Sequence, residues 1–213
     1  MAQYLLPFHA AVVLGNAAMK SVRVCNVMVL TLAACALATP LTVEATDAGQ
    51  ALSLSSAEFT AGSRIPETFV LNAYGCKGGN VSPALSWRGA PAGTKSFALT
   101  LYDPDEKGSP SGWWHWVVYN IPANVTALPR GAGVENSKLL PKGTEQGRSD
   151  LGTVAYHGPC PDVGQAPHHY TFTLYALNVE KLDVPPQASG AMVSYTALGA
   201  TLAKSTLVGM YGR

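Results

Sequence analysis

The chain has 213 residues, and its 14 lysines and arginines nearly balance 13 acidic residues, for a formal net charge of +1. Because these charges are few and scattered, the composition argues against a nucleic-acid-binding surface and against an acidic tail. The 21 glycines and 15 prolines favour short strands joined by turns over a helix bundle.

Residues 1–45 have the features of an export signal. Lys20 and Arg23 precede an apolar run at 27–38, about a dozen residues long, whereas a membrane span needs nearer 20. Cleavage is expected after Ala45 or after Ala38. We therefore divide the chain into an N-terminal extension with a signal peptide (1–45) and one folded domain (46–213), located in the periplasm or secreted.

Two alternatives remain open for this N-terminal segment. The sequence Leu32-Ala33-Ala34-Cys35 resembles a lipoprotein box, in which Cys35 would become a lipidated N-terminus. Simple export is favoured because apolar residues continue past Cys35. Met19-Lys20 is a typical start for a signal peptide, so residues 1–18 would then come from an over-long reading frame.

Export would leave two cysteines in the mature chain, Cys76 and Cys160. An even pair in an oxidising compartment predicts a disulfide, with two buried free thiols as the alternative. A zinc site is disfavoured because neither cysteine belongs to a C-x-x-C pair.

The first half of the domain shows short alternating patterns that predict strands separated by loops. A first strand is expected from Leu52 towards Phe59, and a second extended piece at 64–69. A glycine-rich loop at 74–83 precedes a brief alternation at 85–87. The clearest strand of this half, at 96–101, leads directly into Asp103 and Asp105.

The second half begins with a strand near 116–121 that is apolar on both faces and is therefore expected to be central. Residues 122–152 form a long irregular excursion, which is typical of function or mobility. A strand at 170–176 alternates cleanly. Met192, Tyr195, Leu198 or Gly199, and Leu202 recur every three or four residues, which predicts an amphipathic helix with Ser189 as its N-cap. A short strand at 207–211 closes the chain.

Ionisable side chains lie where strands end or begin. Asp103 and Asp105 follow one strand, and His115 and His168 each begin another. If these ends share one rim of a sheet, the side chains meet there. The arrangement allows a metal site, for which the irregular spacing is weak support, or a small-anion pocket in which histidine N–H groups and a loop N–H, such as that of Gly158, bind phosphate. A hydrolase is less favoured because residues 108–112 fail the G-x-S-x-G pattern.

Several motifs in order carry a resemblance to a known family. They are Asp103-Pro104-Asp105, the run Gly112-Trp113-Trp114-His115-Trp116, Gly158-Pro159-Cys160-Pro161, and His168-His169-Tyr170. Together they resemble the phosphatidylethanolamine-binding protein family, in particular its bacterial, Raf-kinase-inhibitor-like members. The resemblance covers nearly all of the chain from about Leu52 to Arg213.

The resemblance implies a mainly β fold, with a large antiparallel sheet packed on a smaller one and a C-terminal helix, and a shallow anion pocket. The residues it implies for ligand binding are Asp103, Trp113, His115, Gly158, Cys160, Pro161, His168 and Tyr170. Trp113 and Tyr170 could equally be core residues, as large aromatics usually are. No catalytic residue, metal or cofactor is expected.

Three departures from the family pattern concern charge. Asp162 stands where a second proline is usual, and His169 replaces the usual arginine of H-R-Y. Both changes put the affinity for a dianion in doubt. Leu198 and Ala200 stand where bacterial relatives often have an H-x-H pair, which argues further against a metal centre.

We therefore expect a non-enzymatic binding protein for a small phosphate-type anion or phospholipid headgroup, which also modulates a partner protein. One alternative is an inhibitor of a serine protease or another protein, acting through the excursion at 128–152. The other is a weak hydrolase with Asp103 and His115 as an acid/base pair, although the sequence offers no convincing nucleophile. No stable membrane span is expected after processing.

Overall fold

The computed structural model describes residues 51–213. The predicted signal peptide, its cleavage point and Cys35 lie outside the described residues. Within 51–213, no helix combines the length and the apolar character needed to cross a bilayer.

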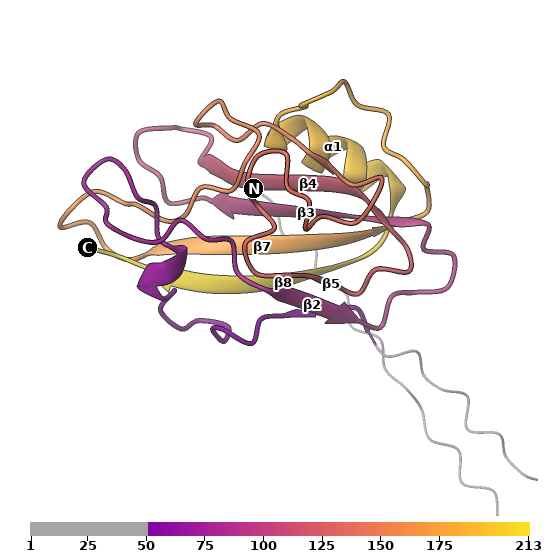
Figure 1. The fold of residues 1–213 in the computed structure, drawn as a ribbon, viewed down its shortest axis with the longest axis horizontal. Helices are drawn as coiled ribbons and strands as arrows, with labels where there is room; N and C mark the ends of the chain where they lie inside the picture. The colour runs from indigo at the N-terminus through magenta and orange to yellow at the C-terminus, as the bar shows by residue number, and fades with distance from the viewer. Residues whose placement is uncertain (1–50) are drawn as a thin grey trace, which may run out of the picture. The chain divides into compact units, whose positions relative to one another are not determined.

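The described strands form two antiparallel sheets (Figure 1). The smaller sheet has the order β1-β2-β5, and the larger has the order β6-β4-β3-β7-β8. The strands are β1 (Ser53–Ser55), β2 (Leu85–Arg88), β3 (Ser96–Asp103), β4 (Trp113–Pro122), β5 (Ala127–Leu128), β6 (Glu145–Gln146), β7 (His168–Leu177) and β8 (Thr201–Tyr211). The helices are the 3-10 helix η1 (Glu67–Phe69) and the α-helix α1 (Gly190–Ala200). The predicted fold class is confirmed.

The large sheet is covered on both faces, as the absence of a polar face in the 116–121 run predicts. One core lies between the two sheets and contains Leu54 and Trp87 from the small sheet with Leu99 and Phe172 from the large one. A second cluster lies between the opposite face of the large sheet and α1, where Val117 of β4 is grouped with Val193 and Ala197 of the helix. The two strands with the strongest apolar patterns, β3 and β4, are therefore internal to the sheet.

Three predicted elements differ from the structure. The first strand spans only Ser53–Ser55, and the piece at 64–69 contains η1 instead of a strand. The short strand expected at 207–211 is the end of β8, which starts at Thr201 directly after the helix. The first half of β8 is an edge segment whose burial alternates only between intermediate and exposed, so it lacks the apolar alternation that identifies a half-buried strand.

The presence of a helix here was predicted correctly, but the apolar repeat that predicted it does not face the sheet, and its last member, Leu202, lies in β8. Ser189 caps the helix, because its side chain accepts a hydrogen bond from the Met192 N–H. Met192, Tyr195 and Leu198 are 46%, 80% and 55% exposed, whereas Val193 and Ala197 are fully buried. A Cβ on Gly190 would lie 2.5 Å from the Trp114 ring. The helix approaches the sheet so closely at this end that small residues make the contact, and the large apolar residues remain in solvent.

This arrangement predicts opposite outcomes for two apolar truncations in one helix. Val193→Ala removes buried methyl groups and should lower the free energy of unfolding by about 2 kcal/mol. Leu198→Ala, on the exposed face, should change it by less than about 0.5 kcal/mol. Urea unfolding of the two variants beside wild type measures both values. A larger loss for Leu198→Ala than for Val193→Ala would mean that the helix packs on its other face.

Candidate functional site

Three strand ends meet at one rim of the large sheet. Asp103, the last residue of β3, is paired with Trp113, the first residue of β4. β7 also runs antiparallel to β3 and begins at His168, with Tyr102 paired to Thr171. The predicted meeting of Asp103, His115 and His168 follows from this antiparallel order, since the end of one strand lies beside the starts of both neighbours.

Asp103 and His168 form a buried pair. Asp103 Oδ2 lies 2.8 Å from His168 Nδ1, and Asp103 Oδ1 accepts a hydrogen bond of 2.8 Å from the Asp105 N–H. Both side chains are almost inaccessible to solvent. Burial raises the pKa of the Asp103 carboxyl above its usual range, although the hydrogen bond from His168 acts in the opposite direction.

His115 lies beside this pair in a defined tautomer. Its Nδ1–H donates to the His157 carbonyl at 3.0 Å, and its Nε2 lies 4.0 Å from Asp103 Oδ2. Burial lowers the pKa of His115 to about 4, so the ring is neutral at neutral pH. With Nδ1 protonated, the neutral ring has only the lone pair of Nε2 for a ligand.

Tyr170, together with Asp103 and His115, forms the polar floor of the site. Its ring makes an edge-on contact with the His115 ring at 5.2 Å between centroids. Burial and the Asp103 carboxylate raise the pKa of the Tyr170 hydroxyl, which therefore keeps its proton and can donate it in a hydrogen bond.

A pocket of about 380 Å³ opens above this floor. Six of the eight predicted ligand residues line it: Asp103, Trp113, His115, Gly158, Cys160 and Tyr170. Pro161 and His168 do not line the pocket. His168 influences it only indirectly, through its contact with the lining residue Asp103. The remaining lining residues are Leu71, Tyr74, Glu106, Leu151 and Asp162. Among the described residues of the lining there is no lysine or arginine, so the ionisable groups are acids and one neutral histidine.

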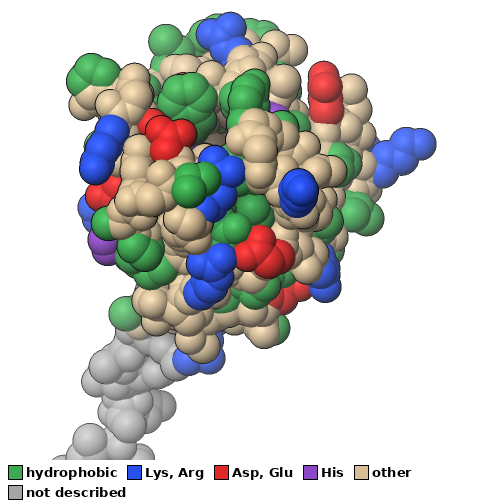
Figure 2. Space-filling model, turned by 90° about the vertical axis from the view of Figure 1, so that its left-hand side faces the viewer, with side chains coloured by type: hydrophobic (Ala, Val, Ile, Leu, Met, Phe, Trp, Pro, Cys, Tyr) green, Lys and Arg blue, Asp and Glu red, His purple; other side chains and the backbone are tan. Residues whose placement is uncertain are grey.

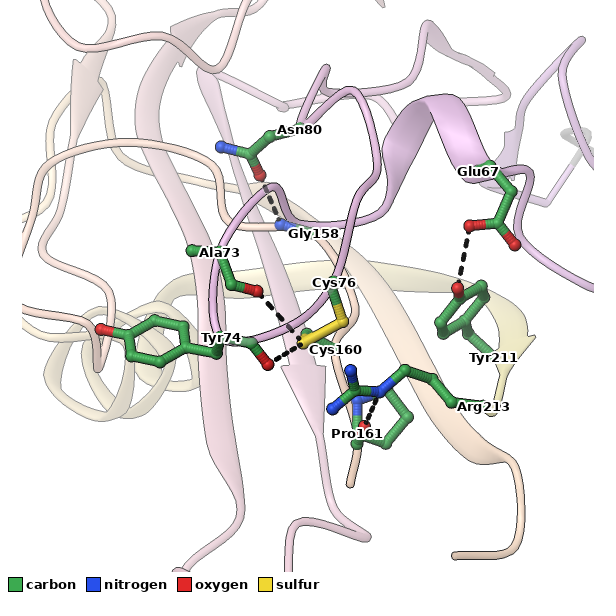
Figure 3. Close-up of a disulfide and its surroundings, with 10 residues drawn as sticks. All are labelled: Glu67, Ala73, Tyr74, Cys76, Asn80, Gly158, Cys160, Pro161, Tyr211 and Arg213. Carbon is green, nitrogen blue, oxygen red and sulfur yellow. Dashed lines mark hydrogen bonds between the residues drawn. A yellow bond between two sulfur atoms is a disulfide. The ribbon is translucent and has the colours of Figure 1, made fainter. Parts of the chain in front are cut away.

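The predicted disulfide between Cys76 and Cys160 is confirmed, with 6.0 Å between the two Cα atoms. It joins the Cys76 loop (residues 70–83) to the Cys160 loop (residues 156–167), as Figure 3 shows. Asn80 Oδ1 accepts a 2.9 Å hydrogen bond from the Gly158 N–H across the same two loops. That N–H was the expected loop donor for an anion, and it already has a protein partner. Tyr74 also lines the pocket; it belongs to none of the family motifs, and in the sequence only its place two residues before Cys76 points to it.

The two departures near the pocket have different surroundings. Asp162 lines the pocket, where its carboxylate accepts a hydrogen bond of 3.1 Å from Gln165. His169 lies outside the lining and pairs with Asp105 at 2.7 Å. Burial alone would raise the pKa of Asp105, but hydrogen bonds from the His169 backbone and ring keep that pKa below its usual value.

Asp103, Glu106 and His168 each place one possible metal-donor atom within 4.8 Å of the others. His168 Nδ1 is bonded to Asp103, and its Nε2 lies 2.8 Å from Gln165 Oε1. A metal ion could bind His168 only by displacing one of these partners. The expectation of a metal-free site remains a prediction.

On the face of the molecule shown in Figure 2, basic and acidic side chains are interspersed and do not separate by sign. This face offers no extended basic field of the kind that binds nucleic acid. It agrees with the near balance of charges along the chain.

A family model described as "Phosphatidylethanolamine-binding protein" matches residues 55–212. The protein YbcL of Escherichia coli (strain K12) is 45% identical over 161 residues, covering 76% of this chain and 87% of YbcL. LppC of Mycobacterium tuberculosis (strain H37Rv), whose name describes a lipoprotein, is 36% identical over 173 residues, covering 80% of this chain and 78% of LppC.

Solved structures agree with these matches. The crystal structure of Escherichia coli YbcL superposes with a TM-score of 0.74 at 44% identity, covering 77% of this chain and 99% of YbcL. A phosphatidylethanolamine-binding protein homologue from Chlamydia trachomatis superposes with a TM-score of 0.64 at 31% identity, covering 76% of this chain and 98% of the homologue.

Proposed function

The chain belongs to the phosphatidylethanolamine-binding protein family, and from that premise we propose that it is a binding protein whose pocket takes a small phosphate-type anion or a phospholipid headgroup. The observation that carries the proposal is a pocket with a buried polar floor of Asp103, His115 and Tyr170 beneath apolar and aromatic walls. Such a pocket can orient a polar headgroup and exclude water from it.

The lining favours binding over catalysis. Among its described residues there is no serine or threonine, and its one cysteine is in the disulfide. The acid/base pair of the hydrolase alternative is also weakly supported, because Asp103 is bonded to His168 and lies 4.0 Å from His115. A hydrolase would need an activated nucleophile here.

A bound anion should be coupled to protonation of His115. The neutral ring offers Nε2 only as an acceptor, so it must gain a proton before it can donate to an anion. The charge-assisted hydrogen bond then formed is stronger than a hydrogen bond between neutral groups. The carboxylates of Glu106 and Asp162 would favour a ligand that also carries an ammonium group, such as phosphoethanolamine.

Sulfate binding tests this coupling, because sulfate does not change its charge between about pH 5 and pH 8, the range that brackets ordinary histidine titration. In the ligand-free protein the pKa of His115 is about 4, and a bound dianion raises that pKa. Affinity should therefore rise as the pH falls, by up to about tenfold per pH unit. Calorimetric titration measures it.

Two histidine variants complete this experiment. His115→Ala should weaken sulfate binding about tenfold or more and flatten its pH dependence. His169→Ala is the matched control, because His169 is exposed and lies outside the pocket lining. A pH-independent affinity in wild type, or unchanged binding in His115→Ala, would contradict the proposal.

We also propose that the protein is exported. The disulfide between Cys76 and Cys160 supports an oxidising compartment. The lipoprotein name of the relative LppC supports the same side of the membrane and keeps the Cys35 alternative open.

Binding of a protein partner is the second function that we propose. Val134 and Leu139, which belong to the excursion at 128–152, are 56% and 54% exposed. With the exposed face of α1 they supply apolar surface that a partner could cover.

A further inference from the structure

A chain of three hydrogen bonds leads from the mouth of the pocket to its floor. Gln165 Nε2 donates to Asp162 Oδ2 at 3.1 Å, and Gln165 Oε1 lies 2.8 Å from His168 Nε2. His168 Nδ1 in turn lies 2.8 Å from Asp103 Oδ2. Asp162 and Gln165 were not assigned a role by the sequence motifs, and Asp162 stands where the family pattern has proline.

Asp162 decides the orientation of the Gln165 amide. A carboxylate only accepts hydrogen bonds, so the Gln165 NH₂ must face Asp162. The amide oxygen then faces His168. Since an amide oxygen also only accepts, His168 Nε2 must carry a proton.

The orientation of His168 fixes the number of protons at the buried floor. With Nε2 protonated, the 2.8 Å contact between Nδ1 and Asp103 still needs a proton of its own. That proton lies either on Nδ1, giving an imidazolium and a carboxylate, or on Asp103, giving two neutral groups. In both cases the pair has a net charge of zero.

We propose that Asp162 and Gln165 are positioning residues that keep the Asp103–His168 pair at zero net charge. Without them, neutral His168 could carry its single proton on Nδ1 and have no proton on Nε2. Its Nδ1–H would then donate to an ionised Asp103, and the floor would carry one negative charge.

The consequence for ligand binding rests on the proposed function. The described lining has no lysine or arginine, so a negative floor would repel an anion directly. A neutral pair removes that repulsion. This hydrogen-bonded relay, from Asp162 through Gln165 and His168 to Asp103, thus allows phosphate-type ligands in a pocket whose mouth is acidic.

Other groups that face the pair are the same in the variants below. His115 Nε2 lies 4.0 Å from Asp103 Oδ2, and Glu106 places a carboxylate oxygen within 4.8 Å of donor atoms of Asp103 and His168. The Tyr170 ring stacks near His168, and the Asp105–His169 pair adjoins it. A change in the protonation of His168 Nε2 therefore reports on Gln165 and Asp162.

The test is ¹⁵N NMR of the His168 ring in the ligand-free protein across the pH range, because protonated and bare ring nitrogens have well separated shifts. In wild type, Nε2 should stay protonated through neutral pH. In Gln165→Met or Asp162→Ala, the Nε2 signal at neutral pH should move towards that of a bare nitrogen, because the acceptor that holds the Nε2 proton is then lost or free to turn away. Val163→Ala, an exposed change in the same loop, should match wild type.

A rescue separates this role from a structural one. The double variant Asp162→Asn with Gln165→Glu exchanges the carboxylate and the amide between the two positions. The carboxylate now at position 165 would accept hydrogen bonds both from the amide at position 162 and from His168 Nε2–H, so the proton should be retained as in wild type. A bare Nε2 in wild type, or an unchanged Nε2 signal in Gln165→Met, would overturn the relay.

Sulfate titration of the same proteins tests the link to function. Weaker binding in Gln165→Met and recovery in the double variant would support it. If the NMR shifts appear but wild type binds no sulfate at any pH, the relay stands and the proposed function fails.

Discussion

Replacement of both bridging cysteines, Cys76→Ser with Cys160→Ser, should lower the free energy of unfolding by roughly 4–5 kcal/mol. The bridge closes a loop with a sequence separation of 84, and the chain-entropy model gives a cost of this size for such a loop in the unfolded state. A domain has only about 5–15 kcal/mol of stability in total, so the loss is a large share. The double variant is preferred because a single change would leave a reactive thiol.

Urea unfolding monitored by tryptophan fluorescence measures this loss. Wild type in excess reductant is the matched control and should unfold at the same urea concentration as the double variant. The Cys76 loop should also lose protection from hydrogen exchange, because the bridge holds it beside the Cys160 loop. Equal stability of the oxidised and reduced proteins would contradict the prediction.

The sequence predicts those parts of the fold in which one pattern decides the structure. β3, β4 and β7 have neighbours on both edges, so their side chains show strong apolar patterns. The edge strand β8 has no such pattern in its first half, where Lys204 and Thr206 are exposed. The helix was found from its period, but its buried face depends on how closely it approaches Trp114, which no local pattern contains.

The candidate site divides in the same way. Family motifs and strand order together bring Asp103, His115 and Tyr170 to one pocket. They do not predict that Asp103 pairs with His168 while His115 turns to the His157 carbonyl. His157 belongs to a stretch without regular structure, and the position of its carbonyl is set by tertiary contacts that the sequence does not display.

Gly158→Ala should destabilise the fold by about 3 kcal/mol and displace the pocket wall at Gly158 and Leu71. A Cβ at this position would lie 2.0 Å from the Phe69 carbonyl oxygen and 2.7 Å from the Leu71 nitrogen. Both contacts are with backbone, so no side chain can turn away from the added methyl group. The backbone cannot easily withdraw, because the Leu71 N–H donates to the Pro159 carbonyl at 3.1 Å and the Tyr156 hydroxyl donates to the Phe69 carbonyl at 2.8 Å.

Gly199→Ala is the matched control for this change. Gly199 lies in the last turn of α1, where an added Cβ would meet nothing within 4 Å. Alanine is the better helix former, so this variant should be more stable than wild type by up to about 1 kcal/mol. The unfolding free energies of the two variants and their sulfate affinities should therefore diverge, with binding weakened only in Gly158→Ala. Wild-type stability in Gly158→Ala would show that the two loops are not in contact at Gly158, and that this glycine belongs to the pocket for a reason other than close packing.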